Sequence, residues 1–433
     1  MWKMFLVALF FCLKRSTRVR METANKKVFL GRQPILDRKQ SIVGYELLFR
    51  SADTLHANIG NFTNVDSFVI SNVLSNFGIH EVLGKHKGFI NVTGDLLMSD
   101  LLEILPREKT VIEILETVEL SDALLERCCE LKERGFTLAL DDNCYHTDYE
   151  PLYEIVDIVK IDVLQTTGDD LKEMVATLSN RGLALLAEKV ETIEQYQLCY
   201  DLGFDLFQGY YFARPSVLNK RKVDVSGIAL LKLLELICRD AEIAEIEEAF
   251  KHNPNLTYNL LRLVNSVVIG MKEKIRTLRH ALVVLGMQQL KRWIQLALFA
   301  SDKTSAVGNP LLETAATRGR LMENLVRKWQ PELQGHDYSD SAFMTGVLSL
   351  IDVLFGVPME EILNQLNLDE EVRLAILERQ GALGSLLLLT EKLESMDFGE
   401  VTLLLNQYAC SQEALVTAQL EAIDWTNCLE EVF

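Results

Sequence analysis

The chain contains the stretch Gly44-Tyr45-Glu46-Leu47-Leu48-Phe49-Arg50, an apolar run interrupted by one acidic residue and closed by a cation. Its composition predicts a β-strand. A carboxylate in such a strand costs free energy unless it binds a partner. We therefore expect Glu46 to belong to a binding site whose other members lie elsewhere in the chain.

Short β-rich segments alternate with helical patterns from about residue 28 to residue 215. The predicted strands cover residues 28–30, 42–49, 88–92, 110–115, 136–140, 158–161, 183–187 and 206–212. The predicted helices include residues 67–77, 121–134, 169–181 and 192–202. This alternation is typical of βα units in a mostly parallel sheet. We expect an α/β fold, a TIM-like (β/α)8 barrel.

Nearly every predicted strand ends in charged or amide residues. In chain order these are Glu46 with Arg50, Asn91, Glu113 with Glu116, Asp141 with Asp142, Lys160 with Asp162, Glu188 with Glu191, and Gln208. A (β/α)8 barrel brings the carboxyl ends of its strands together at one mouth, where the active sites of this fold lie. Each residue alone is compatible with a solvated strand end, but their recurrence predicts a shared site.

The chemistry of this set favours metal ions. Several carboxylates and an asparagine, without histidine or cysteine, suit hard cations such as Mg2+ or Mn2+. Crowded carboxylates repel one another unless a metal neutralises them, and two ions about 4 Å apart can stabilise both oxygens of a phosphoryl displacement. Lys160 fits either contact with water and phosphate oxygens or a salt bridge to Asp162 or Glu188. Arg50 fits either a substrate phosphate or a structural ion pair.

The EAL-domain family carries motifs similar to these strand ends. The similar segments are residues 46–50, 91–93, 113–116, 141–142, 160–162, 188–191 and 208–215. The resemblance implies a barrel phosphodiesterase that opens cyclic di-GMP to linear pGpG with two Mg2+ or Mn2+ ions, in bacterial signalling that controls motility and biofilms.

The same resemblance implies a role for each matching residue. It implies metal ligands at Glu46, Asn91, Glu113, Asp141 and Asp142, and catalytic roles for Glu46, Lys160 and Glu188, of which Lys160 and Glu188 hold or activate the hydrolytic water. It further implies substrate-binding and metal-network contacts from Arg50 and Gln208, and support of the loops by Glu116, Asp162 and Glu191.

The loop after Asp141 departs from the family pattern. Family members carry Asp-Asp-Phe-Gly-Thr-Gly, whereas this chain carries Asp141-Asp142-Asn143-Cys144-Tyr145-His146 and lacks the glycines that let the loop fold tightly. His146 fits either a replacement ligand or a solvated residue. Two functions remain open: an active phosphodiesterase, and a weak or inactive EAL domain that acts as a cyclic di-GMP receptor or a protein-interaction scaffold. The retained carboxylates favour the enzyme, because without metal they only destabilise the fold.

The chain from residue 228 onward predicts an all-α helical bundle. Apolar residues recur at helical spacing in residues 230–236, 257–264, 278–285 and 288–299. We expect breaks at Pro254, Pro310, Pro331, Pro358, Gly346 and Gly356. Residues 253–257, 261–266, 277–281 and 285–286 resemble the HDOD family, a relative of HD-type phosphohydrolases. The resemblance implies an interaction or signalling module.

The helical half lacks the residues of an active HD site, which needs a His-Asp pair on a helix and further histidines. Ser349-Leu350 stands where the pair is expected. The only adjacent pair in the sequence, His336-Asp337, is expected in a polar loop before that helix. We therefore predict that this half is not catalytic.

The sequence predicts four parts: an N-terminal extension over residues 1–25, an EAL barrel over 26–216, a linker over 217–227 and an HDOD domain over 228–433. Within the extension, residues 4–13 are apolar but too few to span a bilayer, which needs about 20. The favoured explanation for this extension is a start codon assigned too far upstream. The alternative is that the extension tethers the protein to a membrane.

The cysteine content and the net charge limit which cellular compartment and which partners are expected. Eight cysteines without a CxxC pair or a regular framework predict reduced, mostly buried thiols in a cytoplasmic protein. A formal net charge of -18 argues against general nucleic-acid binding, which needs clustered Lys and Arg. The expected partners are cyclic di-GMP, an unidentified protein at the HDOD domain and a second copy of the chain in a homodimer.

Overall fold

The computed structural model describes residues 28–51, 79–116, 118–141, 147–209, 225–267, 277–300, 310–329, 336–408 and 410–430. The described residues divide into two compact units. The barrel unit comprises residues 28–209 together with residues 392–416, and the helical unit comprises residues 225–391 together with residues 417–430. No helix in these ranges is long and apolar enough to cross a membrane.

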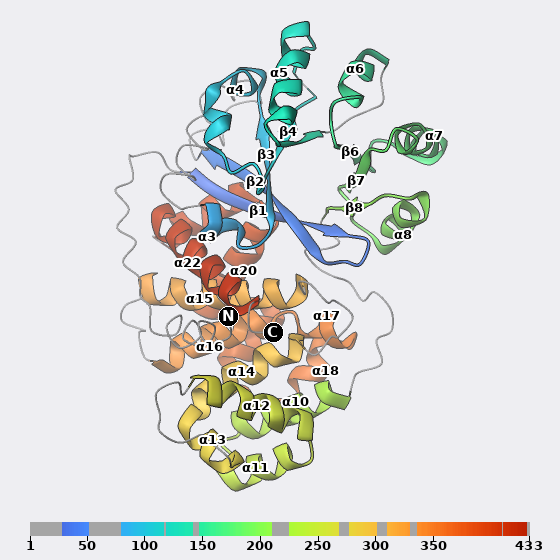
Figure 1. Cartoon of the computed structure of the whole chain (residues 1–433). Helices are drawn as coiled ribbons and strands as arrows, with labels where there is room; N and C mark the ends of the chain where they lie inside the picture. The colour runs from blue at the N-terminus through green and yellow to red at the C-terminus, as the bar shows by residue number, and fades with distance from the viewer. Residues whose placement is uncertain are drawn as a thin grey trace. The chain divides into compact units, whose positions relative to one another are not determined.

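Eight strands of the described chain close a barrel in sequence order (Figure 1). They are β1 (Val28–Asp37), β2 (Ile42–Ser51), β3 (Lys87–Val92), β4 (Thr110–Ile114), β5 (Thr137–Leu140), β6 (Ile158–Asp162), β7 (Ala184–Glu188) and β8 (Leu206–Phe207). The expected barrel is confirmed, and each predicted strand has a counterpart.

One strand of the barrel is reversed. Neighbouring strands from β2 to β8 pair in parallel, whereas β1 is antiparallel to both β2 and β8. A turn of four residues joins β1 to β2, and such a short connection permits only an antiparallel pair. The Asp37 carboxylate fixes this turn by accepting hydrogen bonds from the backbone N–H groups of Lys39 and Ser41.

Several helical segments of the barrel unit begin at a side chain that caps them. They are α3 (Ile79–Leu83), α4 (Gly94–Leu97), η3 (Asp100–Ile104), α5 (Asp122–Glu133), η4 (Thr147–Tyr149), α6 (Glu150–Tyr153), α7 (Gly168–Ser179), α8 (Ile193–Leu202) and α21 (Phe398–Gln407). Ser121 caps α5, and Thr192 forms a capping box with Gln195 at the start of α8. The helices predicted over 121–134, 169–181 and 192–202 are confirmed, and the one over 67–77 lies outside the described residues.

An apolar layer fills the barrel below its polar residues. It contains Ile35, Phe89, Val111, Ala139, Ile158 and Leu186, one from each of six strands. Side chains alternate with a period of two along a strand, so a residue two positions further points to the same face. On β3 to β7, two steps along from this layer lie Asn91, Glu113, Asp141, Lys160 and Glu188. The strand period therefore brings the predicted site residues into the barrel as the next layer.

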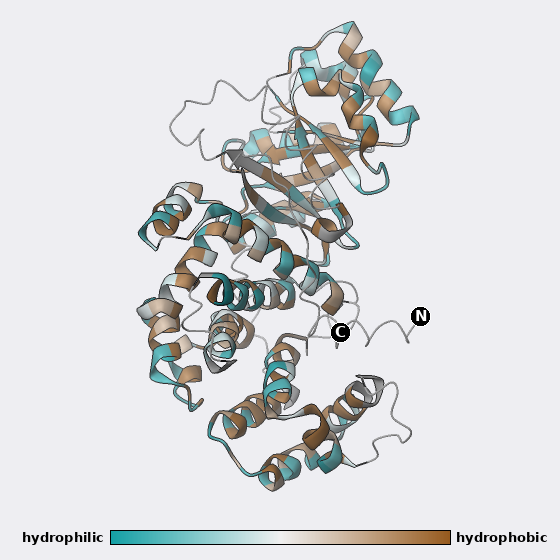
Figure 2. Ribbon diagram, turned by 90° about the vertical axis from the view of Figure 1, so that its left-hand side faces the viewer, coloured by the Kyte–Doolittle hydropathy of each residue, from teal (hydrophilic) through white to brown (hydrophobic). Residues whose placement is uncertain are grey.

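The helical unit confirms the expected all-α architecture. Its helices are α10 (Val225–Cys238), α11 (Ile243–Lys251), α12 (Pro254–Val267), α13 (Leu278–Leu285), α14 (Met287–Ala300), α15 (Pro310–Trp329), α16 (His336–Leu348), α17 (Ile351–Phe355), α18 (Met359–Leu363), α19 (Glu370–Glu378), α20 (Gly381–Glu394) and α22 (Gln412–Glu430), the last two of which also contribute residues to the barrel unit. Hydrophobic and hydrophilic residues intersperse along these helices, as amphipathic packing requires (Figure 2).

Most of the expected helix breaks are confirmed. Pro254 and Pro310 begin helices, Pro358 precedes α18, and Gly356 ends α17 in a left-handed conformation. Pro331 lies outside the described residues.

Two expectations about α16 were wrong. The helix runs through Gly346 without a break, because this glycine serves a close helix crossing: a Cβ atom there would lie 2.6 Å from the Cα of Gly319 on α15. The helix also begins at His336, so the His336-Asp337 pair forms its first turn and not a preceding loop.

Candidate active site

Lys160 lies at the centre of the polar layer. Its ammonium Nζ is 2.7 Å from Glu113 Oε1, 2.7 Å from Asp141 Oδ1, 2.9 Å from Glu188 Oε1 and 3.7 Å from Glu46 Oε2. The Lys160 side chain is fully buried, and the four carboxyl groups are nearly so. Residues separated by up to 142 positions in the sequence therefore share one cation. Of the two salt bridges considered for Lys160, the one to Glu188 forms, whereas Asp162 pairs with Lys189 at 2.6 Å.

Two amide side chains orient Glu46. Asn91 Nδ2 donates a hydrogen bond to Glu46 Oε1 at 2.8 Å. Gln208 Nε2 donates both to Glu46 Oε2 and to Gln33 Oε1, the latter at 2.8 Å. Sequence reasoning missed Gln33, although it lies two residues before Ile35 on β1 and directly opposite Glu46. Knowledge that β1 is antiparallel would have found it.

The charges of the site are unbalanced. Burial raises the pKa of Glu113 well above its ordinary value, with the neighbouring Glu46 and Asp141 adding to the rise against Lys160. Burial likewise raises the pKa of Glu188 to about 8 despite Lys160. Burial also acts to raise the pKa of Glu46, but Lys160, Gln208 and Asn91 outweigh it and hold this pKa below its usual range. One ammonium therefore cannot keep all four carboxyl groups ionised.

Several buried oxygens of the site lack a hydrogen-bond donor among the described residues. Asn91 Oδ1, Gln208 Oε1, Glu113 Oε2 and Glu188 Oε2 accept no hydrogen bond from any residue that the structure describes. Buried polar atoms are normally paired, and carboxylate and amide oxygens are the donors that hard divalent cations prefer. The donor chemistry and the missing charge therefore both fit divalent cations.

The carboxylates are gathered around Lys160 and not around a common metal position. Within the described ranges, no three Asp, Glu, His or Cys side chains are arranged to hold a metal ion as they stand. Lys160 makes ion pairs with four of the predicted metal and catalytic carboxylates. A cation that binds here must therefore compete with the Lys160 ammonium for the same oxygens.

The remaining predicted site residues lie apart from this cluster or outside the described residues. Glu116 and Glu191 are exposed at the ends of their strands and contribute backbone groups: Glu116 O accepts from Tyr149 Oη, and Glu191 N donates to Gln195 Oε1. Asp162 is buried and also accepts from the N–H groups of Leu164 and Gln165. Asp142, the loop residues 143–146 and the side chain of Arg50 lie outside what the structure describes.

The position of the absent His-Asp pair is occupied by a different polar network. Ser349 is buried, donates to the Gly346 carbonyl at 2.7 Å and accepts from Arg318 Nη1 at 2.7 Å. Arg318 is also buried and lies 3.8 Å from Glu391. These groups satisfy one another, and neither Ser349 nor Arg318 is a usual metal ligand. The helical unit thus has an arginine-centred network where a metal pair was sought.

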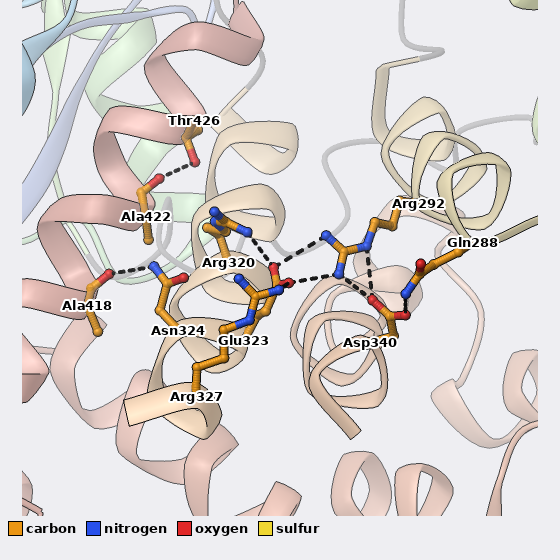
Figure 3. A network of polar contacts seen from close by, with 10 residues as sticks. All are labelled: Gln288, Arg292, Arg320, Glu323, Asn324, Arg327, Asp340, Ala418, Ala422 and Thr426. Carbon is orange, nitrogen blue, oxygen red and sulfur yellow. Dashed lines mark hydrogen bonds and ion pairs between the residues drawn. The ribbon is translucent and has the colours of Figure 1, made fainter. Parts of the chain in front are cut away.

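A second network that sequence reasoning missed joins α14, α15 and α16 (Figure 3). The fully buried Glu323 accepts from Arg292 at 2.8 Å, from Arg320 at 2.7 Å and from Arg327. Arg292 also pairs with Asp340. A buried carboxylate requires such pairing, so this network fixes how the three helices pack.

Comparison with known proteins finds a matching family for each half of the chain. The family model described as the EAL domain matches residues 16–215, and the one described as the HDOD domain matches residues 229–377. The cyclic di-GMP phosphodiesterase CdgJ of Vibrio cholerae is 31% identical over 405 residues, which cover 92% of this chain and 92% of that protein. The chain belongs to the EAL–HDOD family.

A second relative and a solved structure are also similar to this chain. The uncharacterized protein YuxH of Bacillus subtilis is 33% identical over 413 residues. The matched region covers 93% of this EAL–HDOD chain and 99% of YuxH. Among solved structures, an EAL domain protein from Listeria monocytogenes matches with 23% identity and a TM-score of 0.35, covering 43% of this chain and 87% of that one.

Proposed function

We propose that the EAL barrel hydrolyses cyclic di-GMP to linear pGpG with divalent metal ions, and that the HDOD unit relays or regulates this activity. One observation carries the proposal: a buried cluster of four carboxyl groups and one lysine lies where the parallel strands end, with its oxygens short of partners. The sequence similarity to CdgJ, which is named a cyclic di-GMP phosphodiesterase, supports the substrate.

Each polar residue has a proposed task. Glu46, Asn91, Glu113, Asp141 and Asp142 would hold two Mg2+ or Mn2+ ions. When bound, such ions supply charge that stabilises the attacking and leaving oxygens of a phosphodiester displacement. This set reproduces the ligands that the resemblance to the EAL family implies.

The other residues would orient the reactants. Glu188 would accept a proton from the hydrolytic water, and Lys160 would hold that water or stabilise charge on the phosphate oxygens. Gln208 and Gln33 would keep the Glu46 carboxylate in place through the hydrogen bonds between them. Arg50, on the same strand as Glu46, would bind a substrate phosphate.

The decisive experiment is a hydrolysis assay with a metal titration. Purified protein is incubated with cyclic di-GMP and increasing Mg2+ or Mn2+, and pGpG is measured by chromatography. We expect metal-dependent turnover that Glu188→Gln lowers by at least about 100-fold. Glu194→Gln is the control, because Glu194 is an exposed carboxylate on the following helix, α8, and has no predicted part in the site.

The assay also tests the alternative function. Absence of pGpG from this protein, while an active EAL enzyme produces it in parallel, would exclude the phosphodiesterase. Binding of cyclic di-GMP measured by calorimetry under those conditions would then identify a nucleotide receptor. Absence of both turnover and binding would leave the barrel as a protein-interaction scaffold.

A further inference from the structure

One face of the β1–β2 hairpin bears the active site. Directly opposite residues of an antiparallel pair point their side chains to the same face. The opposite pairs are Gln33 with Glu46, Gly31 with Leu48, and Phe29 with Arg50. Since these positions also alternate with a period of two, all six strand positions belong to one face. That face runs from the buried carboxylate of Glu46 to the strand position of Arg50.

A segment from the C-terminal part of the chain covers the end of this face. The α20–α21 turn, taken as residues 395–397 with Phe398, the first residue of α21, belongs to the barrel unit. The ring of Phe398 stacks on that of Phe29 with centroids 5.5 Å apart and planes inclined by 22°. A Cβ atom on Gly31 would lie 3.1 Å from Phe398 Cζ and 3.3 Å from Met396 Sδ. The turn therefore lies directly on β1, at a position where the strand has no side chain.

The turn itself is well fixed. Phe398 and Phe29 are both buried. Asp397 caps α21 by accepting from the N–H of Glu400 at 3.2 Å, and it pairs with Lys392 at 2.9 Å. A turn held in this way can present a defined surface to a ligand.

The covered positions are close to the active site. An antiparallel strand rises about 3.4 Å per residue, so Gly31 is about 7 Å and Phe29 about 14 Å along β1 from Gln33. Because β1 is antiparallel to the other strands, this direction leads out through the mouth of the barrel. Gln33 and Leu48 remain half-buried with the turn in place. The turn therefore borders the accessible part of the face without closing it.

We propose that the α20–α21 turn forms a side wall of the nucleotide site, with the half-buried Met396 as its apolar surface and the buried Phe398 ring as the anchor that holds it on β1. The proposal rests on the proposed function, because it takes cyclic di-GMP as the ligand. A nucleotide that contacts both Glu46 and Arg50 spans the face on which the turn lies. Nucleotide binding and docking of the turn are then linked, and each strengthens the other by the same factor. Through this wall, a segment that follows the HDOD match over residues 229–377 in sequence controls the affinity of the barrel.

Two substitutions undock the turn by opposite means. Phe398→Ala removes the ring that stacks on Phe29. Gly31→Val fills the space beneath the turn with a side chain that suits a strand, so it preserves the barrel if Phe398→Ala impairs folding. Leu403→Ala is the matched control, because Leu403 lies on α21 but is 61% exposed.

The first measurement is the affinity for cyclic di-GMP, as KM from hydrolysis or as Kd from calorimetry. We expect both undocking variants to raise KM or Kd about tenfold, which is a loss of affinity, while kcat stays within about twofold and Leu403→Ala has no effect. The second measurement is hydrogen exchange of residues 396–407, which we expect cyclic di-GMP to slow in the wild type and not in Gly31→Val.

The results separate this proposal from the proposed function. If the wild type binds or hydrolyses cyclic di-GMP but both undocking variants keep its affinity, the wall is refuted and the function stands. If affinity is unchanged by the variants while kcat falls, the turn only braces the barrel, and the wall is again refuted. If the wild type neither binds nor hydrolyses the nucleotide, both proposals fail together.

Discussion

Gly209 offers a sharp test of how the active site is held, because the backbone approaches it closely. Its φ is +154°, and a Cβ atom there would lie 2.3 Å from both the N and the O of Val190. Val190 follows Glu188 by two residues, and its N–H donates to the Gln208 carbonyl at 3.1 Å. Gly209 thus allows the ends of β7 and β8 to meet beside two predicted site residues.

The expected effect of Gly209→Ala follows from this distance. Ordinary contacts of a Cβ atom begin near 3.4 Å, so the two segments must separate by about 1 Å. A displacement of about 1 Å at a catalytic group costs on the order of 100-fold in rate. We therefore expect kcat/KM for cyclic di-GMP to fall about 100-fold. The strained backbone adds a loss of about 1 to 3 kcal/mol in the free energy of unfolding.

Gly182→Ala is the matched control for this experiment. Gly182 also has a positive φ, +77°, but a Cβ atom there would meet nothing within 4 Å. This variant should lose stability through backbone strain and keep its kcat/KM. Hydrolysis kinetics and urea unfolding measure the two effects separately. The reasoning is refuted if Gly209→Ala retains the wild-type kcat/KM, or if Gly182→Ala loses activity equally.

Three further predictions concern buried charge and packing. Lys160→Met should lower the free energy of unfolding by about 3 kcal/mol in EDTA, because the carboxyl groups lose their cation, and Mg2+ should restore more stability to it than to the wild type. Arg292→Met should cost about 3 kcal/mol, because the buried Glu323 and the half-buried Asp340 lose a partner. Burial acts to raise the pKa of Glu323, but its three arginines outweigh burial and lower this pKa. The stability that Glu323 contributes is therefore present above its ordinary pKa of 4.5 and is lost as the pH falls below that value. Arg292→Met should lessen this loss of stability at acid pH. Gly346→Ala should cost about 2 kcal/mol by forcing α15 from α16.

Each of these variants has a control, and urea unfolding measures all of them. Lys172→Met and Arg239→Met remove exposed ion pairs to Asp169 and Glu245, and should change stability by less than about 1 kcal/mol. Gly94→Ala meets only an ordinary contact at 3.6 Å. A variant that loses no more stability than its control would contradict the corresponding contact, as would an equal effect of Mg2+ on Lys160→Met and wild type.

The polar layer was predictable because strand ends and strand period are local properties. Glu113, Asp141, Lys160 and Glu188 each lie two residues after an apolar position of the barrel core. A (β/α)8 barrel places all such positions at one mouth. Convergence of residues from different strands could therefore be expected without coordinates.

The contacts within the layer could not be predicted in this way. For Lys160 the sequence left open a contact with water and phosphate oxygens or a salt bridge to Asp162 or Glu188, and it did not show that the ammonium lies among four carboxyl groups. Gln33 was missed because its role depends on the antiparallel register of β1 with β2. Gly346 was expected to break a helix, but its small size serves the crossing of α15 and α16. Each of these outcomes depends on a neighbour that is distant in sequence.

The sequence by itself determined the barrel, the helical half and the residues around Glu46, because hydrophobic period and strand-end chemistry are written along the chain. Only the tertiary structure decided which oxygens share Lys160, how Gln33 and Gln208 hold Glu46, and that Phe398 lies against β1. These are distances between segments that the chain brings together only on folding. Side-chain packing sets them, and no local pattern encodes it.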